Sequence, residues 1–292
     1  MPFTGRTAAV TGALVAGLLV SRPVARGDTL DEVLRRAANY VADFHRQLSG
    51  IVAEETYTQT VTGAGDATTS TRRLRSDLIL LKAAGERRYV ELRDVFEVDG
   101  AMVRDREARL ERLIGTGSAG TSIGIRDIIA ESARYNIGNI VRNINTPLMS
   151  LLFLQDNYQD RVAFSHKRGN TRVFTAPAER AFNEAPIFRV TTEMWTVEFE
   201  ERRGPTVIRD TRGNNVRTRG RFWINPVSGA VLISELVVGG AVDATVTVSY
   251  QSEPLMGFLV PVEMRESYKR GRTRVEGHAV YGRFRALTER AR

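Results

Sequence analysis

Residues 242–250 read VDATVTVSY and alternate apolar with polar side chains over their whole length. Successive side chains of a β-strand point to opposite faces, so this pattern predicts a strand with one buried face and one wetted face. Strands of this kind belong to antiparallel sheets that pack on a core through one side. The chain therefore has to form such a sheet and to cover one of its faces.

Other stretches add strands to the predicted sheet. Residues 51–61, 72–81 and 87–98 are rich in β-branched and aromatic residues and are separated by turn residues. The same pattern returns at about residue 161 and continues to the end of the chain. Tight turns are expected at Asp99-Gly100, at residues 225–229 (NPVSG) and at residues 269–272 (KRGR).

Helices are expected in two regions. Residues 29–48 carry apolar side chains at helical spacing, with Thr29 as the N-cap and Gly50 as the stop. Between residues 104 and 154 the apolar residues again follow helical spacing, and Pro147 suits the first position of a further helical turn. We therefore predict an α+β fold in which helices, including an insert at about residues 104–154, cover one face of an antiparallel sheet.

The first 27 residues have the pattern of a secretory signal peptide. Arg6 precedes an uncharged apolar run at residues 7–20, which is short for a membrane-spanning helix, and small and polar residues follow. We expect residues 1–27 to be removed on export and residues 28–292 to form a single domain, in the periplasm or secreted. An uncleaved N-terminal anchor is the alternative. The chain has no cysteine, so its stability has to come from a hydrophobic core.

The charge of the chain bears on its partners. The formal net charge is +8, and three arginines of the first 27 residues contribute to it. The other basic residues are spread along the chain and are not gathered with stacking aromatic residues, which argues against nucleic acid as a partner. Basic clusters leave an anionic membrane surface open as a partner. The basic turns at residues 217–221 and 269–274 are candidates for contact with another protein.

Residues 113–122 read LIGTGSAGTS and contain the spacing G-x-G-x-x-G at Gly115, Gly117 and Gly120. A dinucleotide site needs a buried strand before this motif and an acidic residue about 20 positions after it. The preceding residues 104–112 are too highly charged for a buried strand, and the region around residue 140 has no acid. We interpret the stretch as a flexible linker between two helices and expect no cofactor.

No other constellation specifies a catalytic or metal site. The three histidines lie in different predicted elements without the spacing of metal ligands, and no serine has the sequence context of a nucleophile. The carboxylate pairs Glu54–Glu55 and Glu91–Asp94 could serve a glycosidase, but a solvated strand face accounts for them. We expect no catalytic residues and no metal, and a protein that is not an enzyme.

Aromatic residues of the predicted strands indicate an apolar pocket on the inside of the sheet, with ordinary core packing as the alternative. Apolar residues of the helical insert would close this pocket. The candidate lining residues are Trp195, Phe199, Phe222, Trp223, Ile128, Ile129 and Leu152.

The order of these elements resembles the periplasmic lipoprotein-carrier superfamily of the LolA, LolB and RseB type. The local resemblance lies in residues 222–236, FWINPVSGAVLISEL, which look like a hairpin of that family. The predicted helix at residues 29–48 and the strand that follows it fit the opening of the family. The resemblance implies a strongly curved, open half-barrel sheet whose concave face is covered by helices over a cavity for acyl chains. It carries over no individual binding residue.

Together these features favour a non-catalytic exported envelope protein that binds a hydrophobic ligand in an apolar groove. The ligand would be an acyl chain, a lipid or a lipoprotein. Two alternatives stay open. The first is an envelope sensor or scaffold that acts through protein–protein contacts, and the second is a hydrolase that depends on carboxylates such as Glu54 or Glu91.

Overall fold

The computed structural model describes residues 28–63, 68–82, 89–108, 125–174, 191–210, 212–254 and 256–286. The predicted signal peptide and the glycine-rich stretch at residues 113–122 lie outside the described residues. Within the described ranges, no helix is both long enough and apolar enough to cross a membrane.

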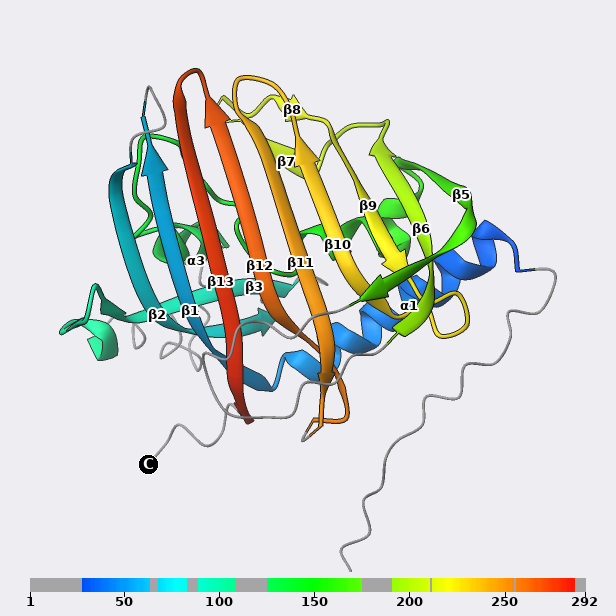
Figure 1. Cartoon of the computed structure of the whole chain (residues 1–292), viewed down its shortest axis with the longest axis horizontal. Helices are drawn as coiled ribbons and strands as arrows, with labels where there is room; N and C mark the ends of the chain where they lie inside the picture. The colour runs from blue at the N-terminus through cyan, green and yellow to red at the C-terminus, as the bar shows by residue number, and fades with distance from the viewer. Residues whose placement is uncertain are drawn as a thin grey trace, which may run out of the picture.

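Eleven strands form one antiparallel sheet in the order β4-β3-β2-β1-β13-β12-β11-β10-β9-β6-β5. The edge strands β4 and β5 do not pair with each other, so the sheet is open, and it fills the front of the view in Figure 1. The predicted antiparallel sheet is thus confirmed. Its strands are β1 (Ile51–Thr62), β2 (Thr68–Lys82), β3 (Tyr89–Val98), β4 (Ala101–Met102), β5 (Val162–Phe174), β6 (Thr191–Glu201), β9 (Thr218–Ile224), β10 (Val231–Val238), β11 (Asp243–Glu253), β12 (Phe258–Arg270) and β13 (Thr273–Ala286), while β7 (Ile208–Arg209) and β8 (Asn215–Val216) form a separate pair.

The sheet has one face covered by the helices, here called the inner face, and an opposite outer face. On β11, the alternation predicted from the sequence is confirmed, because Ala244, Val246, Val248 and Tyr250 are all buried in the core cluster. The polar residues between them point to the outer face. Within the sheet, β1 pairs with β2 on one side and with β13 on the other.

Helix α1 (Leu30–Leu48) lies behind the sheet in Figure 1 and forms as predicted. Its N-terminus has a capping box, in which Thr29 and Glu32 exchange side chain-to-backbone hydrogen bonds. The apolar stripe of α1 is buried in the core cluster, and Phe44 meets Tyr250 of β11 edge-on with 6.0 Å between the ring centroids. The helix thus supplies part of the cover that the inner face requires.

The turn between β9 and β10 fixes α1 on the sheet. Asn225 Oδ1 accepts hydrogen bonds from the N–H groups of Val227 and Ser228, both at 3.0 Å. Gly229 has a φ of 75°, and a Cβ there would lie 2.3 Å from the carbonyl carbon of Arg36 in α1. Arg36 Nη1 in turn donates to the carbonyl of Pro226 at 2.6 Å. The Pro and Gly of this predicted hairpin therefore let α1 approach closely.

The rest of the cover comes from the segment between the two halves of the sheet. Helix α3 (Ile125–Ser132) is followed by an irregular stretch, the 3-10 helix η1 (Met149–Leu154) and the short helix α4 (Asp156–Gln159). The helical spacing of the sequence continues beyond Ser132, but the helix does not. Gly138 adopts a φ of 85°, and several asparagines, which are weak helix formers, follow it. We call residues 136–154 the strap.

Helix α3 covers the open edge of β3. Ser132 Oγ accepts a hydrogen bond from Arg93 N at 3.0 Å and donates one to Glu91 O at 3.2 Å. These two contacts replace the backbone partners that a neighbouring strand would supply at this edge. The end of α3 therefore starts the strap at a fixed place beside the sheet.

Candidate functional site

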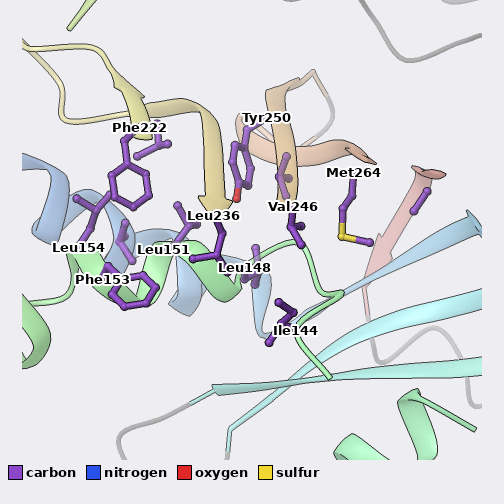
Figure 2. Close-up of a cluster of buried hydrophobic side chains, with 14 of the residues drawn as sticks. Ile144, Leu148, Leu151, Phe153, Leu154, Phe222, Leu236, Val246, Tyr250 and Met264 are labelled. Carbon is purple, nitrogen blue, oxygen red and sulfur yellow. The ribbon is translucent and has the colours of Figure 1, made fainter. Parts of the chain in front are cut away.

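The strap packs a row of apolar side chains against the inner face (Figure 2). Phe153 stacks on Phe199 of β6, and Phe199 stacks on Phe222 of β9, each with 4.8 Å between ring centroids. Gly220 of β9 lies beneath Phe199, because a Cβ at this glycine would come within 2.6 Å of the ring. The three aromatic rings form one continuous stack between strap and sheet.

The row continues along the strap towards the centre of the sheet. Ile144, Leu148, Leu151 and Leu154 of the strap are buried in the same cluster as the inner-face side chains of β10, β11 and β12. Figure 2 shows these residues facing the strands, whose contributions include Leu236, Val246, Tyr250 and Met264. On β6 and on β9 to β12, the inner face is therefore an apolar surface covered by the chain's own strap.

Side chains, rather than a backbone ladder, attach the strap to the sheet. No backbone-to-backbone hydrogen bond links residues 137–147 to the described strands. Near its middle, Leu148 N donates to the carboxylate of Glu91 at 3.2 and 3.3 Å, and Ser150 Oγ donates to Ser234 Oγ at 2.7 Å. At its end, Gln155 Nε2 lies 3.2 Å from His45 Nδ1 of α1. The pairing between strands therefore does not depend on these residues of the strap.

The inner face is polar towards β1, β2 and β3. Arg93 of β3 forms a buried ion pair with Glu55 of β1, at 2.5 Å for Nε and 2.9 Å for Nη2. Ser76 Oγ donates to Glu55 at 2.6 Å, and the Arg93 guanidinium lies 4.5 Å from the centre of the Tyr57 ring. Arg93 Nη2 also donates to the strap carbonyl of Asn145 at 3.0 Å. This ion pair belongs to the sheet but also contacts the strap.

A second buried ion pair joins the strap to β12. Arg142 of the strap lies 3.1 Å from Glu266 Oε1, and neither side chain is exposed to solvent. Tyr57 and Tyr268 both donate hydrogen bonds to Glu266, and Arg142 also donates to Gln59 Oε1. Gly277 of β13 makes room for this carboxylate, since a Cβ there would lie 2.3 Å from Glu266 Oε1. Arg142 is the cation that compensates Glu266.

Burial shifts the pKa of the carboxyl groups beneath the strap. It raises the pKa of Glu91 to about 7, although hydrogen bonds from Thr146 and Leu148 oppose the shift. It also raises the pKa of Glu266, against the opposing effect of the Arg142 charge. At the far end of the strap, burial lowers the pKa of His45 to about 4.

The candidate lining residues lie in three places. Phe199 and Phe222 are buried against the strap, Trp195 is half-buried beside the same cluster, and Leu152 is a half-buried residue of the strap itself. Trp223 alternates with Phe222 and packs with Met194 and Leu232 on the outer face. Trp195 therefore lies on the inner face and Trp223 on the outer face. In α3, which packs on β3, Ile128 is buried and Ile129 half-buried.

The carboxylate pairs considered for hydrolysis do not converge. Glu55 faces Arg93 on the inner face, whereas Glu54 pairs with Arg75 on the outer face at 2.6 Å. Glu91 holds the strap, whereas Asp94 pairs with Arg106 on the outer face at 2.7 Å. The interpretation of these residues as a solvated face is wrong for Glu54, Glu55 and Asp94, which are buried. Their paired arginines offset the cost of that burial.

Shallow grooves lie on the outer face and have polar linings. One has a volume of about 530 Å³ and includes Glu198, Arg219, Arg221 and Glu235. In it, Arg221 and Glu235 form a two-point ion pair at 2.9 Å for both contacts. Among the residues that the structure describes, no group of three or more His, Asp or Glu side chains is arranged to hold a metal ion.

The sequence reasoning missed the polar half of the inner face. Arg93, Arg142 and Glu266 lie in stretches that read as an ordinary strand or helix, and nothing in their spacing links them. One signal was available, since Arg142 interrupts the apolar residues Ile140 and Ile144. A lone charge within an apolar run can mark a buried pair.

Comparison with protein-family models gives no match, and neither does comparison with curated proteins. Two solved structures are similar to the chain. A DUF1329 family protein from Desulfovibrio piger shares 10% identity with a TM-score of 0.36, over 87% of this chain and 93% of that chain. A putative outer membrane lipoprotein-sorting protein domain from Vibrio parahaemolyticus shares 11% identity with a TM-score of 0.34, over 85% and 92% respectively. The resemblance to the lipoprotein-carrier superfamily stays a prediction from the sequence, because likenesses at this identity and TM-score carry no conclusion about superfamily or ligand.

Proposed function

We propose that this chain is a non-catalytic protein of the cell envelope that binds the acyl chain of a lipid or lipidated protein against the inner face. The bound chain would take the place of the strap's apolar side chains. In this proposal the inner face is the concave face of a half-barrel, and α1 and the strap are its cover. Export to the envelope rests on the signal-peptide pattern of residues 1–27.

The observation that carries the proposal is a continuous apolar surface covered by a separable segment. The strap contributes Leu148, Leu151, Phe153 and Leu154 to the core, and side-chain contacts rather than a backbone ladder attach it to the sheet. A short 3-10 helix has little stability of its own. Replacing one row of buried methylene and aromatic groups by an alkyl chain would conserve most of the buried apolar area.

The proposed ligand site keeps most of the residues selected from the sequence. Phe199 and Phe222 would form its floor, and Trp195 its end beside β5. Leu152 would move with the strap, and Ile128 and Ile129 would support the helix from which the strap starts. Trp223 is left out, because it lies on the outer face.

Titration with a fluorescent fatty acid tests the proposal directly. The full chain should bind the probe, and Phe153→Ala should bind it roughly tenfold more tightly, because a cavity destabilises the strap-covered state that competes with the ligand. Phe96→Ala is the matched control. It removes the same ring from the outer face, where Phe96 lies between Arg75 and Arg106, and should leave the affinity unchanged.

Mass spectrometry of the purified protein provides a second measurement. Protein from envelope extracts should carry an acyl lipid. If it carries none, and neither the natural chain nor Phe153→Ala takes up the fatty acid, the lipid-binding proposal is wrong and a scaffold acting through protein contacts is the better reading.

A further inference from the structure

The strap presents one cation and one neutral carbonyl to the polar half of the inner face. We propose that the natural ligand also carries a cation and a neutral carbonyl, so that it is an acyl amphiphile with a cationic head group beside a carbonyl, and that anionic amphiphiles bind less tightly. This inference rests on the proposed function and adds the chemical class of the ligand.

Glu266 requires the cation. Its only ion-pair partner among the described residues is Arg142, which would leave with the strap. Tyr57 and Tyr268 stay behind on the sheet and can donate hydrogen bonds, but they bring no charge. Arg93 also stays and its charge acts on Glu266, but its ion pair is with Glu55. A buried carboxylate without a compensating cation is strongly unfavourable. An ammonium or guanidinium group of the ligand would fill the place of the Arg142 guanidinium.

Arg93 requires an oxygen acceptor rather than a second anion. Its charge is already balanced by Glu55, but its Nη2 also donates to the carbonyl of Asn145, which would leave with the strap. Its Nη1 is buried and has no hydrogen-bond acceptor among the described residues. An amide or ester carbonyl supplies acceptor lone pairs without adding negative charge next to Glu55. An anionic head group would face Glu55 and Glu266 together.

The two polar contacts are close enough for one small head group. Both involve Tyr57, since the Arg93 guanidinium lies over its ring and its hydroxyl donates to Glu266. Asn145 Nδ2 also donates to this hydroxyl at 3.3 Å. Along the strap, Arg142 and Asn145 are followed by Leu148, Leu151 and Leu154, so a polar head leads directly into the apolar row. The strap thus resembles the proposed ligand, with a polar head followed by an apolar tail.

A pair of single-chain amphiphiles tests the inference on the full chain by isothermal titration. Glycine dodecylamide carries an ammonium beside its amide carbonyl, whereas N-lauroylglycine carries a carboxylate beside the same kind of carbonyl. The amine should bind at least roughly tenfold more tightly than the acid, because a charged hydrogen-bonded contact to a buried group is at stake. Acetylating the amine of the first probe should remove its advantage.

Glu266→Gln should abolish the preference while the alkyl chain still binds. Glu263→Gln is the matched control, since Glu263 lies on the same strand, faces outward and pairs with Arg265 and His278. It should keep the preference. If Glu266→Gln does not fold, the acetylated probe on the natural chain still decides the question.

The outcomes separate the two proposals. Equal binding of amine and acid, or tighter binding of the acid, overturns the head-group inference and leaves acyl-chain binding intact. Failure of all three probes, together with failure of the fatty-acid titration, overturns the proposed function itself.

Discussion

Gly220 is the point at which the aromatic stack meets the sheet. A Cβ at this position would lie 1.9 Å from the carbonyl oxygen of Glu235 and 2.6 Å from the Phe199 ring. Backbone and a stacked ring cannot both move aside in a close-packed core. The sheet therefore depends here on the absence of a side chain.

We expect Gly220→Ala to lower the free energy of unfolding by about 3 kcal/mol or more, measured by urea denaturation. Gly50→Ala is the control, because a Cβ at Gly50 would meet nothing within 4 Å. A Gly220→Ala protein as stable as the Gly50→Ala protein would show that Phe199 does not pack over β9 in this way.

Arg106 holds together two carboxylates that would otherwise repel. Asp77 of β2 and Asp94 of β3 lie directly opposite each other, and Arg106 Nη2 contacts them at 2.6 and 2.7 Å. Like charges opposite each other destabilise a strand pair. Arg285 also reaches Asp77, at 2.7 Å.

Arg106→Gln should therefore lower the free energy of unfolding by about 1–2 kcal/mol at neutral pH, because it removes the cation that lies between the two carboxylates. Arg46→Gln breaks an exposed pair with Asp43 on α1 and should change stability by less than about 0.5 kcal/mol. Chemical denaturation of both variants checks the difference, and equal losses would contradict it.

At the scale of elements, η1 is the part of the strap that decides how tightly the inner face is closed. Leu151 is 1% exposed, whereas its neighbour Leu152 is only half-buried. Because both residues are leucines at adjacent positions, a difference between their alanine variants reports the difference in burial.

Leu151→Ala should lower the free energy of unfolding by about 2–4 kcal/mol, and Leu152→Ala by less than about 1 kcal/mol. Thermal and urea denaturation measure both. The same pair should differ in fatty-acid binding, with Leu151→Ala the tighter binder, because it weakens the cover more. The reverse order would mean that η1 presents its other side to the sheet.

The elements that could be predicted from the sequence are those with a strong local pattern. Helix α1, the strands on both sides of the strap and the hairpin at residues 225–229 follow from periodicity, capping and turn residues. The strap could not be predicted, because Ile140, Ile144 and Leu148 have helix-like spacing but are buried by a sheet that is distant in sequence. Tertiary packing decides its conformation.

The residues of the candidate site also divide into those that could be predicted from the sequence and those that could not. Phe199 and Phe222 could be found because large aromatic residues in amphipathic strands point to an apolar interior. The prediction for Trp223 was wrong, because it follows Phe222 in the same strand and successive side chains point to opposite faces. The pairs Glu55–Arg93 and Glu266–Arg142 join residues 38 and 124 positions apart, so no local pattern reports them.

At the scale of the whole molecule, stability depends on pH through two titratable residues, Glu91 and His45, which contact the two ends of η1. Glu91 accepts a hydrogen bond from Leu148 at its start, and His45 contacts Gln155 at its end. The pKa of His45 falls from 6.5 to about 4, so the unfolded chain binds the proton first and stability is lost as pH falls through that window. The pKa of Glu91 rises from 4.5 to about 7, so its contribution to stability increases as pH falls from 7 to 4.5.

We therefore expect His45→Gln and Glu91→Gln to change the pH dependence of stability in opposite directions. Between pH 7 and 4, the natural chain should lose roughly 2–3 kcal/mol relative to His45→Gln. Relative to Glu91→Gln it should gain stability over the same range. Urea denaturation at several pH values measures this, with His278→Gln, on the outer face, as the control. Parallel curves for all of the proteins would refute the assignment.

The pairing of β1 with β13 has a consequence for the order in which the protein can form. The chain is synthesised from its N-terminus, yet one edge of its first strand stays unpaired until the last strand has been made. Contacts between residues so distant in sequence make folding slow. In the export proposed above, the pairing of β1 with β13 would form only after almost all of the chain has crossed the membrane.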